Sequence, residues 1–194
     1  MEIGSGPGGL TRGLLSEGAH RVVAIEKDKR CISALREIQK HYPERLQIIE
    51  GDASEMHQEK YFTKPVKVVA NLPYNIGTKL LIEWLTAKNW PPFWDSLTLM
   101  FQNEVAERIA AKPGEKSYGR LSVLSNWRCK TSIKMKLNPE VFYPSPKVTS
   151  AVVQIEALKS PNYDANLSIL EKIVATAFNQ RRKMLRSSLK SLTP

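Results

Sequence analysis

The sequence lacks the features that mark membrane-spanning, secreted and metal-binding proteins. Its uninterrupted apolar stretches run only a few residues, as at positions 68–70, whereas a helix that crosses a bilayer needs about twenty. No basic segment followed by an apolar one opens the chain, so no secretory signal is visible. The two cysteines allow at most one disulfide and have no metal-ligand spacing. We therefore expect a cytoplasmic protein with no membrane segment and no bound metal.

Acidic residues are scarce in the last part of the chain. Residues 1–111 hold 14 basic and 14 acidic side chains, whereas residues 112–194 hold 15 basic and 5 acidic ones. The whole net charge of +10 therefore lies in the second part. A basic surface that only keeps the protein soluble is the simpler alternative, but such surfaces do not divide a chain in this way. The imbalance favours a second part that faces a polyanion.

The apolar pattern predicts alternating strands and helices. Short apolar, β-branched segments at residues 22–26, 46–49, 66–70 and 97–101 are typical of buried strands. Apolar residues recur at helical spacing after Asp28 and again after Thr78. We take Thr78 as the N-cap of the second of these helices. This alternation predicts an α/β fold with a doubly wound, mostly parallel Rossmann-like sheet.

The pattern changes beyond residue 130. Residues 131–137 and 149–156 predict an antiparallel pair of strands at the edge of the sheet, and the proline-rich segment between them leaves no room for a helix. Residues 167–178 predict an amphipathic helix, and Leu185, Leu189 and Leu192 predict the apolar side of another. We divide the chain into a domain of residues 1–157 and a small helical domain of residues 158–194. Both are expected to be incomplete, because residues 1–3 are short for a core strand of about five residues and the last helix stops at Pro194.

A glycine-rich loop and two acids mark a ligand site at the carboxyl edge of the predicted sheet. Gly4, Gly6 and Gly9 satisfy the dinucleotide-binding spacing, and glycine lets a ligand approach the backbone closely. Glu26 ends the next strand, where its carboxylate can accept hydrogen bonds from ribose hydroxyls. Asp52 follows the third strand and suits an adenine amine, although it could simply cap a helix. The loop fits NAD as well as S-adenosylmethionine, but acids at successive strand ends favour an adenosyl ligand.

The tetrapeptide Asn71-Leu72-Pro73-Tyr74 follows the fourth predicted strand, beside the reactive end of the expected ligand. An aromatic amine is a poor nucleophile because its lone pair is delocalised into the ring. An asparagine oxygen and a backbone carbonyl can accept hydrogen bonds from both amine hydrogens, which orients the nitrogen and stabilises the charge that develops on it. Pro73 stiffens the loop, and Tyr74 offers a face for a stacked base. The alternative is an ordinary β-turn, in which Asn and Pro are common.

The series of motifs resembles the ribosomal RNA adenine dimethyltransferase family, in particular its bacterial members that act on small-subunit RNA. The resemblance covers essentially the whole chain, from the glycine loop and residues 71–76 to residues 118–122, 142–148 and 180–186. It implies the class I methyltransferase form of the sheet, with S-adenosylmethionine as cofactor. It also implies dimethylation of two adjacent adenines in a terminal hairpin of the RNA, with an immature small ribosomal subunit as partner. We expect the enzyme to act as a monomer.

The motifs and the resemblance together assign the candidate site residues. The catalytic set is Asn71, Leu72, Pro73, Tyr74 and Phe142. The resemblance implies that Phe142 stacks on the flipped base opposite Tyr74. The cofactor set is Gly4, Ser5, Gly6, Glu26, Asp52, Ala53 and Asn71. The basic residues expected to contact RNA are Lys112, Lys116, Arg120, Lys147, Arg181, Arg182, Lys183, Arg186 and Lys190, and Arg128 and Lys130 continue the same basic run.

Three other functions stay open at this point. A non-catalytic ribosome-assembly factor on the same fold would bind RNA without turnover. A macrolide-resistance relative that methylates large-subunit ribosomal RNA would share the mechanism, although residues 180–186 resemble the small-subunit enzymes. A dehydrogenase would bind nicotinamide, but this function would leave residues 71–74 and the basic second part without a role.

Overall fold

The computed structural model describes residues 1–179 and 183–192, with the side chains of all of these except Tyr74 and Asn75. The predicted RNA contacts of Arg181 and Arg182 lie outside the described residues. The chain forms two compact units, one of Met1–Leu81 with Pro92–Met100 and one of Ile82–Pro91 with Phe101–Pro194. In the described ranges no helix is long and apolar enough to cross a membrane.

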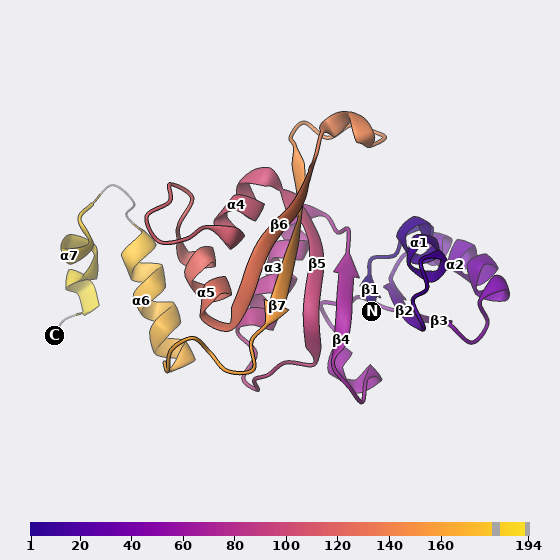
Figure 1. Ribbon diagram of the computed structural model, residues 1–194, viewed down its shortest axis with the longest axis horizontal. Helices are drawn as coiled ribbons and strands as arrows, with labels where there is room; N and C mark the ends of the chain where they lie inside the picture. The colour runs from indigo at the N-terminus through magenta and orange to yellow at the C-terminus, as the bar shows by residue number, and fades with distance from the viewer. Residues whose placement is uncertain (180–182, 193–194) are drawn as a thin grey trace. The chain divides into compact units, whose positions relative to one another are not determined.

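Parallel strands form the sheet of the first unit (Figure 1). They are β1 (Glu2–Ile3), β2 (Val22–Glu26), β3 (Leu46–Glu50), β4 (Val66–Ala70) and the larger part of β5 (Trp94–Gln102). Their order is β3-β2-β1-β4-β5, and each neighbouring pair is parallel. The chain runs outward from β1 to β3 and then returns to the other side of β1 as β4. This reversal creates a switch point, at which the carboxyl ends of the strands leave a crevice for a ligand.

Helices cover this sheet and supply its core. They are α1 (Gly9–Ser16), α2 (Lys29–His41), the 3-10 turn η1 (Gln58–Tyr61) and the first turns of α3 (Tyr74–Leu85). As predicted, α2 begins after Asp28, whose carboxylate accepts a hydrogen bond from the Arg30 amide at 2.9 Å. All of β2 is buried, as its continuous apolar pattern indicated for a strand covered on both faces. Its residues Val22 and Ala24 pack with Leu15 and Leu46 in one cluster.

The second unit combines helices with an antiparallel pair of strands. Its elements are α4 (Asn103–Ala110), α5 (Arg120–Arg128), β6 (Cys129–Leu137), η2 (Pro139–Val141), β7 (Ser150–Ala157), α6 (Leu167–Asn179), α7 (Leu185–Ser188) and η3 (Leu189–Leu192). Strands β6 and β7 pair along their whole length, from Cys129 opposite Ala157 to Leu137 opposite Ser150, and lie side by side in Figure 1. The prediction of an α/β fold with a mostly parallel Rossmann-like sheet and an antiparallel pair is confirmed.

Two local predictions were wrong. Thr78 does not cap a helix, because α3 already begins at Tyr74 and the amides of Ile76 and Gly77 both donate to the Pro73 carbonyl. A proline lacks an amide hydrogen and has a fixed φ, so it suits the position just before a helix. The apolar pattern after residue 184 is not one helix but a single α turn followed by a 3-10 turn, and 58% of Leu185 is exposed. Helices in proteins are stabilised mainly by packing of an apolar face, and the exposed Leu185 contributes little to such packing.

Arg128 was expected in the RNA-facing basic run, but it is only 7% exposed. Its guanidinium carbon lies 4.1 Å from the centre of the Trp127 ring and 4.9 Å from that of Trp90. Its Nη1 donates hydrogen bonds to the carbonyls of Leu85 and Ala87 at 3.3 and 2.8 Å. Indole faces and carbonyls thus replace water around a buried cation. Arg128 therefore holds α5 to the end of α3 within the second unit.

Replacing Arg128 with Met should destabilise the second unit. The substitution keeps most of the apolar length but leaves two carbonyls without their donor, so we expect the free energy of unfolding to fall by about 2–4 kcal/mol. Urea denaturation followed by circular dichroism measures the change. Lys88→Met, at an exposed lysine in the same connection, is the matched control and should shift stability by less than about 0.5 kcal/mol. Equal stability of the two variants would contradict the structural role of Arg128.

Candidate functional site

A cavity of about 220 Å³ opens at the carboxyl ends of the strands of the first unit. Seven predicted site residues line it: Gly4, Glu26, Asp52, Ala53, Asn71, Leu72 and Pro73. They lie at the ends of four different strands and are brought together only by the parallel sheet. The walls also contain Ile3, Ile25, Lys27, Gly51, Ile76 and Leu80, which the sequence analysis did not single out. The apolar members of this group could not be predicted as site residues, because their sequence pattern does not differ from that of ordinary core residues.

The glycine loop turns sharply to leave room for its neighbours. Gly4 has a φ of +66°, and a Cβ built on it would lie 2.4 Å from Cδ2 of Leu72. A side chain at this position would therefore strain the backbone and push against residue 72. Ser5 is buried and Gly6 binds Glu26 through its amide, but neither lines the cavity. Their predicted cofactor contacts stay predictions, and the structure gives them a part in shaping the loop.

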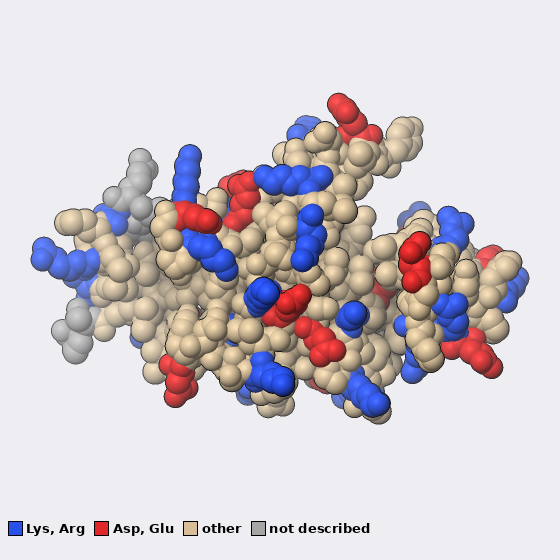
Figure 2. Space-filling model, viewed as in Figure 1, with Lys and Arg blue, Asp and Glu red and all other residues tan. Residues whose placement is uncertain are grey.

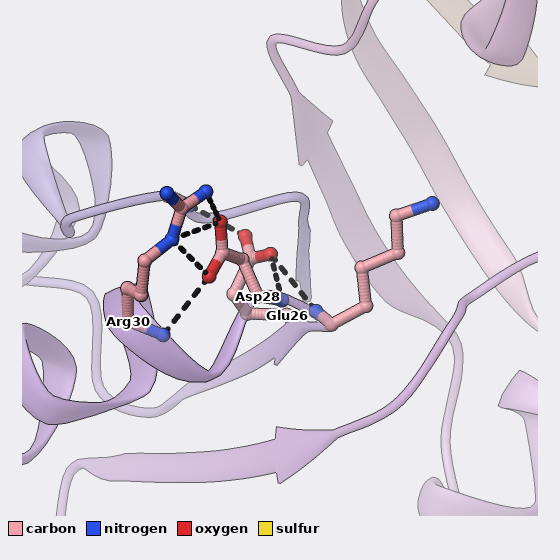
Figure 3. Close-up of polar contacts among 5 residues, drawn as sticks. Glu26, Asp28 and Arg30 are labelled. Atoms are coloured by element: carbon pink, nitrogen blue, oxygen red, sulfur yellow. Dashed lines mark hydrogen bonds and ion pairs between the residues drawn. The ribbon is translucent and has the colours of Figure 1, made fainter.

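Glu26 is the polar group around which the loop is arranged. Glu26 is 7% exposed, and its carboxylate accepts hydrogen bonds from the amides of Gly6 at 2.7 Å and of Lys27 and Asp28 at 2.8 Å (Figure 3). These bonds fill three of the roughly four acceptor positions of a carboxylate. The carboxylate is thereby held in one orientation at the cavity wall and still has capacity for a ligand hydroxyl.

Arg30 balances the acid that stands next to Glu26 in this turn. Its guanidinium pairs with the Asp28 carboxylate at 2.7 Å, as Figure 3 shows. The hydrogen bonds from Arg30 lower the pKa of Asp28 to about 2. This pair is solvent-exposed, so its role is to keep a second negative charge compensated beside the ligand site rather than to stabilise the fold.

Asp52 occupies the end of the neighbouring strand. Its Oδ1 accepts hydrogen bonds from the amide and hydroxyl of Ser54 at 2.9 and 2.7 Å, and its Oδ2 lies 3.3 Å from the Lys27 ammonium. The Ser54 bonds first, and Lys27 second, hold the pKa of Asp52 below its ordinary value. No helix begins at Asp52, which instead opens a turn closed by the Glu55 amide. Its alternative role as a helix N-cap is therefore excluded.

Residues 71–73 form the remaining wall of the cavity. Asn71 and Pro73 are exposed, while Leu72 is half-buried against Gly4. Tyr74 is the first residue of α3, and the stacking role of its side chain stays a prediction. The loop is therefore held on one side by β4 and on the other by a helix start, which restricts how Asn71 can move.

The other predicted residues lie in the second unit. Phe142 is half-buried at the end of η2, and its carbonyl accepts a hydrogen bond from the Ser145 hydroxyl at 3.2 Å. Its stacking on a flipped base stays a prediction. The described basic residues of the RNA set are all exposed: Lys112, Lys116, Arg120, Lys147, Lys183, Arg186 and Lys190. On the face in Figure 2, both basic and acidic side chains are exposed over this unit.

A Rossmann-like sheet whose glycine loop and strand-end acids converge on one cavity defines a nucleoside-binding α/β protein. The comparisons with known proteins give the family. Residues 1–194 match the ribosomal RNA adenine dimethylase family, and the chain belongs to it. The family resemblance predicted from the motifs is thus confirmed.

Individual relatives agree with this membership. The chain is 60% identical to the ribosomal RNA small subunit methyltransferase A of Dinoroseobacter shibae and 61% identical to that of Paracoccus denitrificans, over all of this chain and 69% of each relative. A dimethyladenosine transferase from Plasmodium falciparum superposes with a TM-score of 0.81 at 32% identity, over 97% of this chain and 66% of that one. The 23S rRNA methyltransferase ErmE superposes with a TM-score of 0.76 at 26% identity. The match covers 100% of this chain and 75% of that one.

Replacing Glu26 with Gln should weaken binding of S-adenosylmethionine. The amide keeps the shape of the side chain but replaces one acceptor oxygen with a donor, so it cannot serve the loop amides and a ribose hydroxyl together. We expect the Kd to rise by about 10- to 100-fold, equivalent to about 1–3 kcal/mol. Isothermal titration calorimetry measures it. Glu37→Gln, on the exposed face of α2, should bind as the unchanged chain does, and equal affinities of the two variants would count against the site.

Proposed function

We propose that this protein transfers methyl groups from S-adenosylmethionine to the exocyclic amines of two adjacent adenines, in a hairpin loop near the 3′ end of small-subunit ribosomal RNA. The observation that supports the proposal most directly is the cavity at the switch point of the sheet. It brings Glu26, Asp52 and Asn71 together in one unit. Membership of the whole chain in the ribosomal RNA adenine dimethylase family supplies the substrate class.

The lining of the cavity fits an adenosyl group. We assign the ribose hydroxyls to Glu26, whose orientation is already fixed by three amides. Asp52 is assigned to the adenine amine, because its carboxylate stands at the next strand end. The apolar walls from Ile25 and Leu80 suit the faces of the base. S-adenosylmethionine itself supplies a methyl group activated by a positively charged sulfur.

The chain's own contribution to methyl transfer is to hold the acceptor amine. The side-chain oxygen of Asn71 and a backbone carbonyl of the loop accept its two hydrogens, which directs the nitrogen lone pair and stabilises positive charge on that nitrogen. Tyr74 and Phe142 are proposed to stack on the two faces of the flipped adenine. No histidine is needed as a base, and the three in the chain, His20, His41 and His57, are exposed and do not line the cavity.

The second unit is proposed to face the RNA. Its exposed lysines and arginines can contact phosphates, and residues 158–194 would form the small RNA-contacting domain. We propose an immature small ribosomal subunit as the partner and a monomer in the cytoplasm as the acting form. The large-subunit alternative is less favoured, because the relatives at about 60% identity are named for the small subunit, whereas ErmE, named for 23S RNA, is 26% identical.

Replacing Asn71 with Ala tests this function. The variant loses the acceptor that orients the amine, so methyl transfer from labelled S-adenosylmethionine to unmethylated small subunits should fall by about 100-fold or more. Binding to the subunits should change little, because one uncharged side chain is removed. Asn89→Ala, at an exposed asparagine outside the cavity, is the control and should keep full activity.

Each competing function predicts a different result in the same assay. Transfer by Asn71→Ala at the unchanged rate would exclude the proposed mechanism. An unchanged chain that binds small subunits but transfers nothing would identify the assembly factor. Methylation of large subunits in preference to small ones would identify the large-subunit relative.

A further inference from the structure

A second cavity, of about 410 Å³, lies entirely within the second unit. It is formed by the loop between α4 and α5, by α5 itself, by the start of β6 and by the segment that follows β7. Its polar and aromatic lining residues are Lys112, Tyr118, Asn126, Lys130, Asn162 and Tyr163. Of these, Lys112 belongs to the predicted RNA-contacting set and Lys130 to the basic run that continues it, but the cavity itself has been given no role.

An aromatic platform forms one side of this cavity. Tyr163 is 47% exposed, and its ring is tilted by 31° on that of Trp127 with 6.4 Å between ring centres. The backbone carbonyl of Tyr163 also accepts a hydrogen bond from the Trp127 indole at 2.8 Å. The ring is therefore in contact with a buried residue while part of the tyrosine is open to solvent, so it can serve as a stacking platform.

Two cations stand at the cavity without an acidic partner. The Lys112 ammonium donates to Oδ1 of Asn126 at 3.0 Å, and Asn126 is itself fixed by donating to the carbonyls of Ala111 and Ser122 at 3.1 and 2.8 Å. Lys130 is exposed at the start of β6. Neither lysine forms an ion pair with a described residue.

Two acids that neighbour these lysines form no ion pair with them. The Glu115 carboxylate accepts the backbone amide of Lys112 at 2.9 Å, rather than its ammonium. Glu156 is the cross-strand neighbour of Lys130 in the β6–β7 pair, but no ion pair joins them. Lys112 is thus held in place by a neutral acceptor, and its charge stays available to an anion from outside.

We propose that this cavity binds a single-stranded nucleotide of ribosomal RNA, separate from the adenines that are methylated. The base lies on the exposed face of Tyr163, and Lys112 and Lys130 contact the flanking phosphates. A tyrosine and two cations that line one cavity suit a splayed nucleotide, because every base has a face to stack while its backbone is anionic. An acidic protein segment would use the lysines but would leave the open tyrosine face without a partner. This inference rests on the proposed function, because it takes the partner to be RNA.

A short fluorescein-labelled oligouridylate is the probe that tests this site. It contains no adenine, so its binding is independent of the methyl acceptor. Tyr163→Ala should weaken its binding to the full chain by about 5- to 150-fold, which corresponds to the stacking of one base. Tyr163→Phe keeps the ring and should bind as the unchanged chain does. The matched control is Tyr61→Ala, at an exposed tyrosine of the first unit, which should have no effect.

The lysines are tested through the salt dependence of the same binding. Lys112→Gln and Lys130→Gln should each lower the affinity and reduce the slope of log K against log salt concentration by about 0.7, the value for one phosphate contact on a single strand. Lys172→Gln, at an exposed lysine on α6 outside the cavity, should leave the slope unchanged. Circular dichroism melts of every variant separate lost binding from lost folding.

Three results would overturn the inference. The first is oligouridylate binding that is absent, or equally tight in Tyr163→Ala and the unchanged chain. The second is an effect of Lys172→Gln as large as that of Lys112→Gln, which would show a diffuse charge effect. The third is displacement of the probe by polyglutamate as readily as by unlabelled oligouridylate, which would identify an acidic protein segment as the occupant. Failure of methyl transfer with intact Tyr163-dependent binding would overturn the proposed function alone.

Discussion

The carboxylate of Glu26 is the constraint on which the ligand site depends. A backbone amide that is removed from water needs an acceptor, and Glu26 supplies one to Gly6 in the loop and to two residues at the start of the next turn. These bonds tie the glycine loop to the end of β2. Because the loop is held there, Gly4 lies against Leu72, and the segment that carries Asn71 is placed on the same cavity.

The acids around this cavity are compensated in two different ways. Asp28, which does not line the cavity, is paired with the guanidinium of Arg30. Asp52, which lines it, is held mainly by the neutral groups of Ser54 and more loosely by the exposed ammonium of Lys27. A neutral donor fixes a carboxylate without cancelling its charge, so Asp52 keeps its capacity to accept a further hydrogen bond. Among the described residues that line this cavity, Lys27 is the one cation.

Basic residues in the second unit serve two unrelated purposes. Arg128 is enclosed by two indole rings and two carbonyls, so it contributes to folding and is not available to RNA. Lys112 and Lys130, which stand in the same basic run of sequence, line a solvent-accessible cavity instead. The net charge of the sequence counts buried and exposed basic residues alike, although only the exposed ones can contact a phosphate. The two roles also differ in the aromatic residues nearby. Tryptophan rings enclose the buried Arg128, whereas a partly exposed tyrosine lines the cavity of Lys112 and Lys130.

The sequence by itself determined the α/β class, the strand positions, the start of α2 and the family, because periodicity, capping and motif spacing are local properties that a few neighbouring residues express. It also identified most of the residues around the first cavity, since the ends of parallel strands must meet at one edge. Only the tertiary structure decided that Lys27 reaches Asp52, 25 residues away, that Arg128 is buried against Ala87, 41 residues away, and that Tyr163 is supported by Trp127, 36 residues away. Burial and the choice of partner depend on residues far apart in the chain, and no local pattern records them.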